Sequence, residues 1–238
     1  MRPTIILVHG AFAESGSWNQ VIDKLESEGH AVIAAANPLR SLAGDAASIG
    51  DLVRTVDGPV VLVAHSYGGA VVSNVRADAG EITGLVYVNG FAPGPGEHCF
   101  QLAGMFPGSR LNEETARPVP RSDGTTDLYI DQDRFREIFC ADVAAPQAAQ
   151  MAATQRPATQ EALTEPSGER PLWRELPSWF LIGEEDRIIP AELQRFMSDR
   201  AGARQVLEIP GGSHGVAVAQ PQATADLILE AVAVPAAA

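Results

Sequence analysis

Three residues of this 238-residue chain have the types and the order needed for nucleophilic catalysis: Ser66, Asp186 and His214. A serine hydroxyl is a weak nucleophile until a histidine takes its proton. An aspartate can fix the tautomer of that histidine and stabilise its charged form. Together the three side chains predict acyl transfer, in which the serine oxygen attacks a carbonyl carbon.

The serine lies in a short sequence that suits a sharp turn. Ser66 follows the apolar residues 60–64, and the small residues Ala64 and Gly68 stand two positions before and after it. A serine between a strand and a helix has strained backbone torsions, and such a turn closes only around small residues. We therefore expect Ser66 to project from the end of a strand, with a helix behind it.

An oxyanion forms in acyl transfer, and it needs backbone N–H donors. The turn at Ser66 places the N–H of Tyr67 at the start of a helix, where the partial positive charge favours an anion. The loop after the first apolar run supplies a second donor, the N–H of Ala11. The sequence therefore predicts an oxyanion hole formed by Ala11 and Tyr67.

Other titratable residues stand beside the expected site. Glu184 and Glu185 compete with Asp186 for the role of the acid. The Gly-x-x-Asp spacing favours Asp186, and we expect the two glutamates to form a solvated pair. His9 and His65 flank the expected site as well, and we expect them to support loops by hydrogen bonds rather than to carry protons.

Apolar runs and helical patterns alternate along the chain. Strands are predicted at 4–8, 30–36, 60–64, 85–89, 178–182 and 205–209. This alternation predicts an α/β fold with a mostly parallel six-stranded sheet and helices on both faces. The loops that follow parallel strands meet at one edge of the sheet, which would bring Ser66, Asp186 and His214 together.

Residues 91–175 break this alternation. Proline and glycine are frequent there, and short helical stretches at 134–141 and 145–153 lie between polar loops. A structureless loop of that length is implausible in a compact domain, so we expect a helical lid inserted into a single domain whose core is 1–90 and 176–238. Four side chains are candidates for the wall of the substrate pocket: Phe12, Phe91, His98 and Met105. Aromatic residues near a sheet edge are also common in hydrophobic cores.

Composition limits the partners. A net charge of −13, with 17 lysines and arginines, disfavours nucleic acid and anionic membranes. Two cysteines, Cys99 and Cys140, are too few for a disulfide framework, and no group of cysteines and histidines has the spacing of a zinc site. We therefore expect no metal and no cofactor.

The N-terminal sequence shows no targeting segment. Met1 leads straight into an apolar run without a basic leader, and no apolar run approaches membrane-spanning length. We expect a cytoplasmic protein, with a monomer and a homodimer both open.

Over nearly its whole length the chain resembles the α/β-hydrolase superfamily. The matching segments are 8–11 (Val-His-Gly-Ala), 64–69 (Ala-His-Ser-Tyr-Gly-Gly), 183–186 (Gly-Glu-Glu-Asp) and 213–214 (Ser-His). The opening His-Gly-Ala-Phe followed by Ser-Trp is similar to small serine esterases related to plant methyl esterases and hydroxynitrile lyases. The chain departs from the usual pattern at Ala64, where the superfamily has glycine.

The resemblance implies a serine hydrolase that cleaves a small to medium, largely apolar carboxylic ester through an acyl-enzyme. A thioester, lactone or amide would use the same machinery. Hydroxynitrile lyases carry threonine and lysine where this chain has Gly10 and Gly215, which disfavours that activity. A carbon–carbon bond hydrolase, a cofactor-independent oxygenase and a non-catalytic ligand-binding member remain as alternatives, and the intact set of three residues argues against the last.

Overall fold

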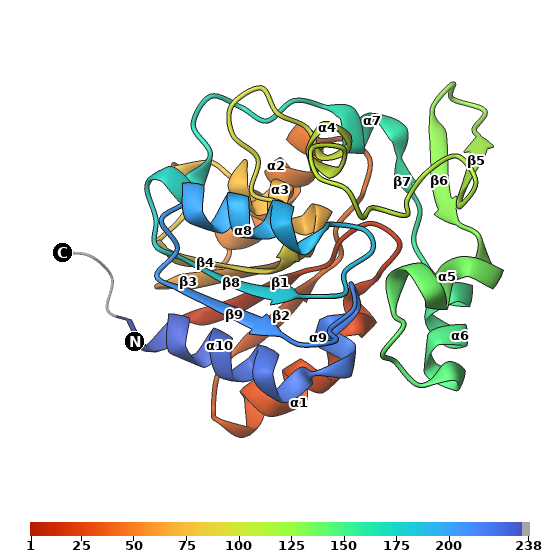
Figure 1. Ribbon diagram of the computed structural model, residues 1–238. Helices are drawn as coiled ribbons and strands as arrows, with labels where there is room; N and C mark the ends of the chain where they lie inside the picture. The colour runs from red at the N-terminus through yellow and green to blue at the C-terminus, as the bar shows by residue number, and fades with distance from the viewer. Residues whose placement is uncertain (235–238) are drawn as a thin grey trace.

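A six-stranded parallel sheet forms the centre of the fold, as the sequence predicts. The computed structural model describes residues 1–234 (Figure 1). In sheet order the strands are β2 (Val32–Ala35), β1 (Thr4–Val8), β3 (Val60–Ser66), β4 (Ile82–Gly90), β8 (Ser178–Gly183) and β9 (Gln205–Ile209). Each of the six predicted strands is therefore confirmed.

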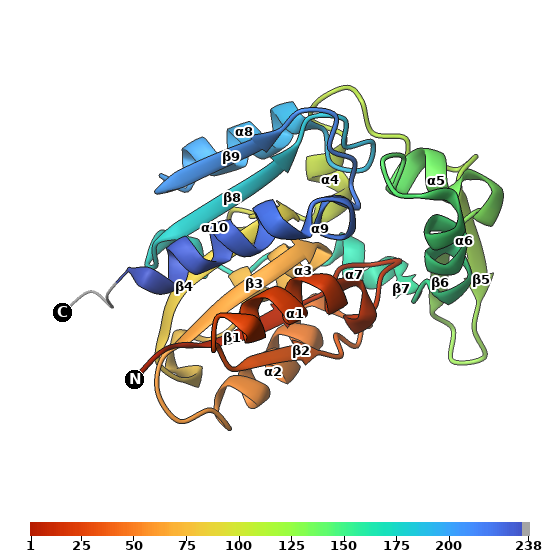
Figure 2. The same cartoon turned by 90° about the horizontal axis from the view of Figure 1, so that it is seen from below.

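Helices cover both faces of this sheet, which is why its strands are apolar without alternation. In β1, Ile5 and Leu7 pack on one face and Ile6 and Val8 on the other, and all four are fully buried. Figures 1 and 2 show the helices on the two sides of the sheet. The first face is covered by α1 (Asn19–Ser27) and α10 (Pro221–Ala233), the second by α2 (Leu42–Val53), α3 (Tyr67–Ser73) and α8 (Ala191–Arg200).

Residues 91–175, called the insertion from here on, leave the main sheet after β4 and lead back to β8. Part of the insertion lies beyond the edge at which the strands end, with β5, β6, α5 and α6 grouped there (Figure 1). Its helices are α4 (Cys99–Ala103), α5 (Gln132–Phe139), α6 (Ala145–Thr154), α7 (Gln160–Thr164) and the short 3₁₀ helix η3 (Leu172–Arg174). The insertion therefore lies where the loops of the predicted site emerge.

The prediction of a purely helical insertion was wrong. A second, antiparallel sheet lies in it, formed by β5 (Ala116–Pro120), β6 (Thr126–Ile130) and β7 (Ala158–Thr159). Pro118 and Pro120 conceal β5 from sequence reasoning, because proline lacks the N–H that a central strand needs. An edge strand such as β5 tolerates proline, and β7 is too short to give a period-2 pattern.

The remaining elements are short: η1 (Ser15–Trp18), η2 (Ala77–Ala79) and α9 (Val216–Ala219). Helix α9 begins immediately after the loop that carries His214. Within residues 1–234, no helix combines the length and the apolar character that crossing a membrane requires.

Candidate active site

Ser66 occupies a strained turn between β3 and α3. Its backbone torsions are φ 55° and ψ −127°, in a region that residues other than glycine rarely adopt. Such a conformation costs on the order of 1–3 kcal/mol and persists only where its surroundings hold it. The Ser66 carbonyl accepts a hydrogen bond from the N–H of Phe91 at 3.1 Å, which ties the turn to the end of β4.

Two glycines allow the first loop to pack directly on this turn. A Cβ added to Gly68 would lie 2.6 Å from the carbonyl oxygen of Val8, and one added to Gly10 would lie 2.5 Å from the Ser66 Cβ. Neither position has room for a side chain. The expected small residue at position 68 is therefore required by this contact, and the same packing brings Ala11 beside Ser66.

The predicted acid and base are hydrogen-bonded to each other. His214 Nδ1 lies 2.8 Å from Asp186 Oδ2, and both side chains are completely buried. The Oδ1 atom of Asp186 accepts from the N–H groups of Ile188 (2.8 Å) and Ile189 (2.9 Å). Its Oδ2 atom also accepts from Gln194 Nε2 at 3.0 Å. These charge-assisted bonds fix the carboxylate, which in turn holds the proton of the imidazole on Nδ1.

With its proton on Nδ1, the His214 ring has a lone pair on Nε2 to accept another. That nitrogen is buried and has no hydrogen-bond partner within residues 1–234. The ring lies 4.6 Å from the ring of His65 and 4.8 Å from that of Phe139, measured between centroids. His65 directly precedes Ser66 in the chain, so the imidazole of His214 packs against the residue before the serine. No hydrogen bond joins Ser66 Oγ to His214 among the described residues, and such catalytic contacts tighten when substrate binds.

His9 and His65 have the supporting roles that the sequence predicts. His9 Nδ1 contacts the carbonyl of Gly10 at 2.9 Å, and its Nε2 accepts from the N–H of Asn37 at 3.1 Å. Burial lowers the pKa of His9 to about 4. His65 Nε2 lies 2.9 Å from the carbonyl oxygen of His214 and therefore donates to it. Burial and the neighbouring His214 lower the pKa of His65 well below its usual value, so no fixed cation opposes a charged His214.

The depressed pKa of His9 predicts a loss of stability in mild acid. Below pH 6.5 the unfolded chain binds a proton at His9 that the folded chain does not bind until about pH 4. The free energy of unfolding should therefore fall as the pH drops through this window, by on the order of 3 kcal/mol from this residue. Urea unfolding at pH 7 and pH 4.5 measures the change, and a His9→Gln variant should show a smaller pH dependence. An equal dependence in both proteins would contradict this role for His9.

The two residues predicted to supply oxyanion donors, Ala11 and Tyr67, line the same cavity as Ser66. The N–H of Tyr67 opens α3, and no protein acceptor for it or for the N–H of Ala11 is present within the described chain. The Tyr67 side chain is fixed separately, because its hydroxyl donates to Asp45 Oδ2 at 2.8 Å. Burial and the Asp45 carboxylate raise the pKa of Tyr67 far above its usual value, so this hydroxyl stays protonated.

A cavity of about 690 Å³ opens onto Ser66. Its wall includes both residues of the predicted oxyanion hole and two of the four predicted pocket residues, Phe12 and Phe91. The predictions for the other two were wrong. The side chain of His98 caps α4 by accepting from the N–H of Gln101 at 3.2 Å, and Met105 is 47% exposed. Neither residue belongs to the cavity wall, to which α4 contributes Cys99, Phe100 and Ala103 instead.

Two residues that sequence reasoning missed hold the site together. Asn89, near the end of β4, donates from Nδ2 to the carbonyl of Ser213 at 2.8 Å and accepts on Oδ1 from the N–H of Gly183 at 2.6 Å. It thus joins the loops that carry Asp186 and His214. Gln194 is fully buried and contacts the Asp186 carboxylate. Asn89 could have been found from the sequence, because it is a polar residue at the end of the apolar run 85–89. No sequence pattern marks Gln194 as a residue of the site.

Neither cysteine forms a disulfide in the described part of the chain, and both are buried. Cys99 contributes to the cavity wall, and burial raises the pKa of its thiol well above the usual range, so it remains a thiol. Among residues 1–234, no three His, Cys, Asp or Glu side chains gather in a way that could hold a metal ion.

Solved structures of esterases share this architecture. Polyneuridine aldehyde esterase superposes with a TM-score of 0.80 at 18% identity, over 97% of this chain and 99% of that chain. A pyrethroid hydrolase from Sphingobium faniae gives a TM-score of 0.78 at 21% identity, over 98% of both chains. At these identities the likeness shows the fold.

Sequence comparisons point in the same direction. A pyrethroid hydrolase of Sphingobium wenxiniae is 27% identical over 98% of this chain and 88% of its own length. Methylesterase 9 of Arabidopsis thaliana is 25% identical over 94% of this chain and 96% of its own. The model of the alpha/beta hydrolase family matches residues 5–227. Because this family model matches most of the chain and the fold agrees with it, the chain belongs to the alpha/beta hydrolase family.

Proposed function

We propose that this hydrolase cleaves neutral carboxylic esters of small to moderate size, with Ser66 as nucleophile, His214 as base and Asp186 as its partner. The observation that carries the proposal is the strained turn of Ser66 at a cavity of about 690 Å³, beside a buried His214–Asp186 pair. The relatives named above are a pyrethroid hydrolase and a methylesterase, which supports ester cleavage.

In the first step the ester carbonyl lies against Ser66. His214 Nε2 takes the hydroxyl proton as Oγ bonds to the carbonyl carbon, and the carbonyl oxygen becomes an oxyanion. The N–H groups of Ala11 and Tyr67 stabilise that charge. The tetrahedral intermediate then collapses, the bond to the leaving oxygen breaks, and the imidazolium protonates the departing alcohol. The product of this step is an acyl-enzyme on Ser66.

Water completes the cycle by the same route. His214 takes a proton from water, the resulting hydroxide adds to the acyl carbon, and the second oxyanion occupies the same two N–H groups. Breakdown returns the proton to Ser66 Oγ and releases the carboxylic acid. Asp186 stabilises the imidazolium of His214 during both acylation and deacylation, and it remains an ionised carboxylate throughout. These steps use only groups of this chain and the water consumed.

The insertion acts in this proposal as a lid that shapes the substrate cavity. It is fastened to the core by Arg40, whose guanidinium contacts Asp127 Oδ1 at 2.5 Å and the Pro157 carbonyl at 2.7 Å. It also supplies most of the apolar wall, including Phe91, Leu128 and Leu163. A mostly apolar wall buries the body of a substrate, while few polar groups set its orientation.

The charge of the cavity predicts which esters are accepted. Among the described residues that line it, Glu113 alone carries a formal charge. Arginines of the insertion such as Arg117 and Arg134 lie at the surface in ion pairs with acidic residues. An acidic group on the substrate would therefore meet a like charge without a balancing cation.

We expect p-nitrophenyl butyrate to be a better substrate than the similar-sized anionic ester mono-p-nitrophenyl succinate. The ratio of their kcat/KM values should be roughly fivefold, because repulsion of like charges at an exposed site costs on the order of 1 kcal/mol. Added salt and a Glu113→Gln substitution should both narrow the ratio. Equal kcat/KM values would exclude charge selection by Glu113, and no cleavage of any ester would refute the proposed function.

A further inference from the structure

The end of α5 packs directly against the loop that carries His214. The N–H of Gly215 donates to the carbonyl of Phe139 at 2.7 Å. A Cβ added to Gly215 would lie 2.9 Å from the Cβ of Cys140, so this contact has no spare room. The ring of Phe139 also lies edge-on to the imidazole of His214. The insertion thus reaches the base itself as well as the substrate cavity.

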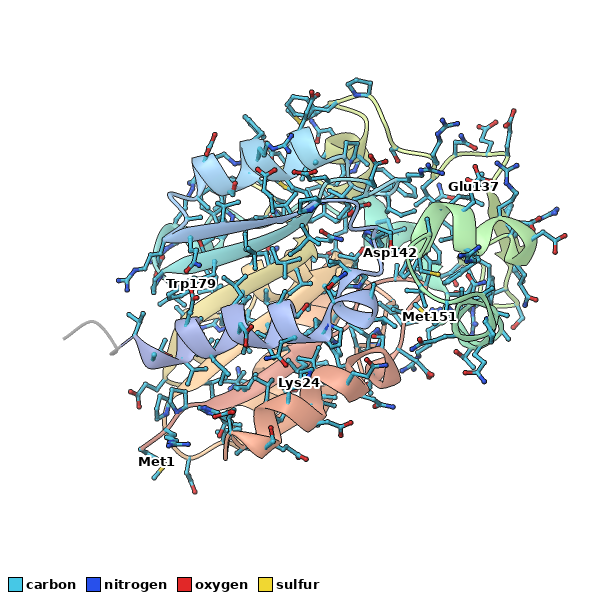
Figure 3. All side chains as sticks on the ribbon, turned by 60° about the horizontal axis from the view of Figure 1, so that its bottom comes forward. Met1, Lys24, Glu137, Asp142, Met151 and Trp179 are labelled. Atoms are coloured by element: carbon cyan, nitrogen blue, oxygen red, sulfur yellow. The ribbon has the colours of Figure 1, made fainter. Side chains whose placement is uncertain are left out.

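Asp142 makes the polar part of this contact. Its Oδ2 atom accepts from the N–H of Ser213 at 3.0 Å, and its Oδ1 atom accepts from the Ser213 hydroxyl. The Ser213 Oγ in turn accepts from the N–H of Gly215 at 3.1 Å. Figure 3 shows Asp142 at the boundary between the insertion, in green, and the C-terminal segment, in blue. Asp142 therefore holds Ser213 directly and reaches Gly215 through the Ser213 hydroxyl, while the Phe139 carbonyl accepts from the same Gly215 N–H.

The core holds the same loop from the other side. The carbonyl of His214 receives hydrogen bonds from His65 Nε2 at 2.9 Å and from Asn89 Nδ2 at 3.2 Å. Those two bonds fix the carbonyl of the residue but leave the N–H groups of Ser213 and Gly215 to the insertion. The direction of the imidazole depends on both sets, because the backbone on each side of His214 sets the position of its Cα–Cβ bond.

We propose that Asp142 is a positioning residue for the base, acting through Ser213, so that the insertion takes part in catalysis as well as in substrate binding. This inference rests on the proposed role of His214. Asp142 does not belong to the wall of the cavity that opens onto Ser66. Its loss should therefore impair the chemical step and leave substrate binding unchanged.

The matched pair for the test is Asp142→Ala and Asp133→Ala. Asp133 is an exposed carboxylate of α5 whose side chain makes no hydrogen bond within residues 1–234. Asp142→Ala should lower kcat for p-nitrophenyl butyrate by on the order of tenfold with KM unchanged, because small displacements of a catalytic group are costly. Asp133→Ala should match the wild type. Asp142→Asn keeps an oxygen acceptor for the Ser213 N–H and should recover most of the lost rate.

A double-mutant cycle tests whether Asp142 affects kcat through its contacts with Ser213 or by a general loss of stability. Asp142→Ala combined with Ser213→Ala should lose no more activity than Asp142→Ala alone, since Asp142 acts through Ser213 and the hydroxyl holds the Gly215 N–H only while the carboxylate orients it. Additive losses in the double variant, or an Asp142→Ala enzyme with the kcat of Asp133→Ala, would overturn the proposal.

Hydrogen exchange provides a readout that does not require ester cleavage. Amides in peptides covering residues 211–215 should exchange faster in Asp142→Ala and at the wild-type rate in Asp133→Ala. Unchanged exchange in Asp142→Ala would refute the positioning role even in an active enzyme. Faster exchange in a protein that cleaves no ester would instead keep the positioning of the loop and reject the proposed function.

Discussion

Replacing Ser66 with alanine is expected to lower kcat for p-nitrophenyl butyrate by about 10⁴-fold or more. The substitution removes the only atom that forms the acyl-enzyme bond, while the oxyanion donors and the cavity remain. A small residual rate over water is expected from those groups. The measurement is the steady-state rate, with substrate binding followed separately by competition with an unreactive ester analogue.

The fold should survive this substitution, because alanine differs from serine by one oxygen. The thermal midpoint should stay within a few degrees of the wild-type value. Ser27→Ala is the matched control, since Ser27 is exposed at the end of α1 and far along the chain from the site. Substantial hydrolysis by a folded Ser66→Ala protein would place the nucleophile at another residue.

The second large effect is expected from Asp186→Asn, which should lower kcat by roughly 10³- to 10⁴-fold. An amide can turn its NH₂ group toward His214 Nδ1, which then carries the lone pair. The proton moves to Nε2, and the ring can no longer accept the proton of Ser66. The amide also leaves the imidazolium without a balancing charge in its fully buried place beside Asp186.

Glu184 and Glu185 provide the controls for this prediction, because both are exposed carboxylates next to Asp186 in the chain. Glu184→Gln and Glu185→Gln should retain wild-type activity. A loss of activity in either one that equals the loss in Asp186→Asn would transfer the role of the acid to that glutamate. The hydrogen bond between Asp186 and His214 makes this outcome the unexpected one.

The main sheet could be predicted because its strands are buried on both faces. Runs such as 60–64 are apolar throughout, so the strands could be recognised without deciding which face of each strand is buried. Because Ser66, Asp186 and His214 each follow a predicted strand, their convergence could then be predicted from the rule that the loops after parallel strands meet at one edge of the sheet. Ala64 in place of glycine did not prevent the turn, because its methyl group is buried in the core beneath it.

The insertion was less predictable, since its structure depends on contacts between distant segments. The short strand β7 exists only because Asp127 and Leu128 of β6 pair with it. His98 and Met105 were expected in the pocket from their positions in the chain, yet the wall is formed by Cys99, Phe100 and Ala103 of α4, which lie between them. Likewise, Asp142 contacts Ser213, in the loop that carries His214, across 71 residues of sequence, and no local sequence pattern predicts that contact.

The most direct measurement is the location of the covalent adduct formed with diethyl p-nitrophenyl phosphate. We expect one phosphoryl group per chain, found by peptide mass spectrometry on Ser66, with labelling and loss of ester hydrolysis advancing together. An adduct on a different residue, or full hydrolysis by a chain already labelled at Ser66, would contradict the assignment of Ser66 as the nucleophile.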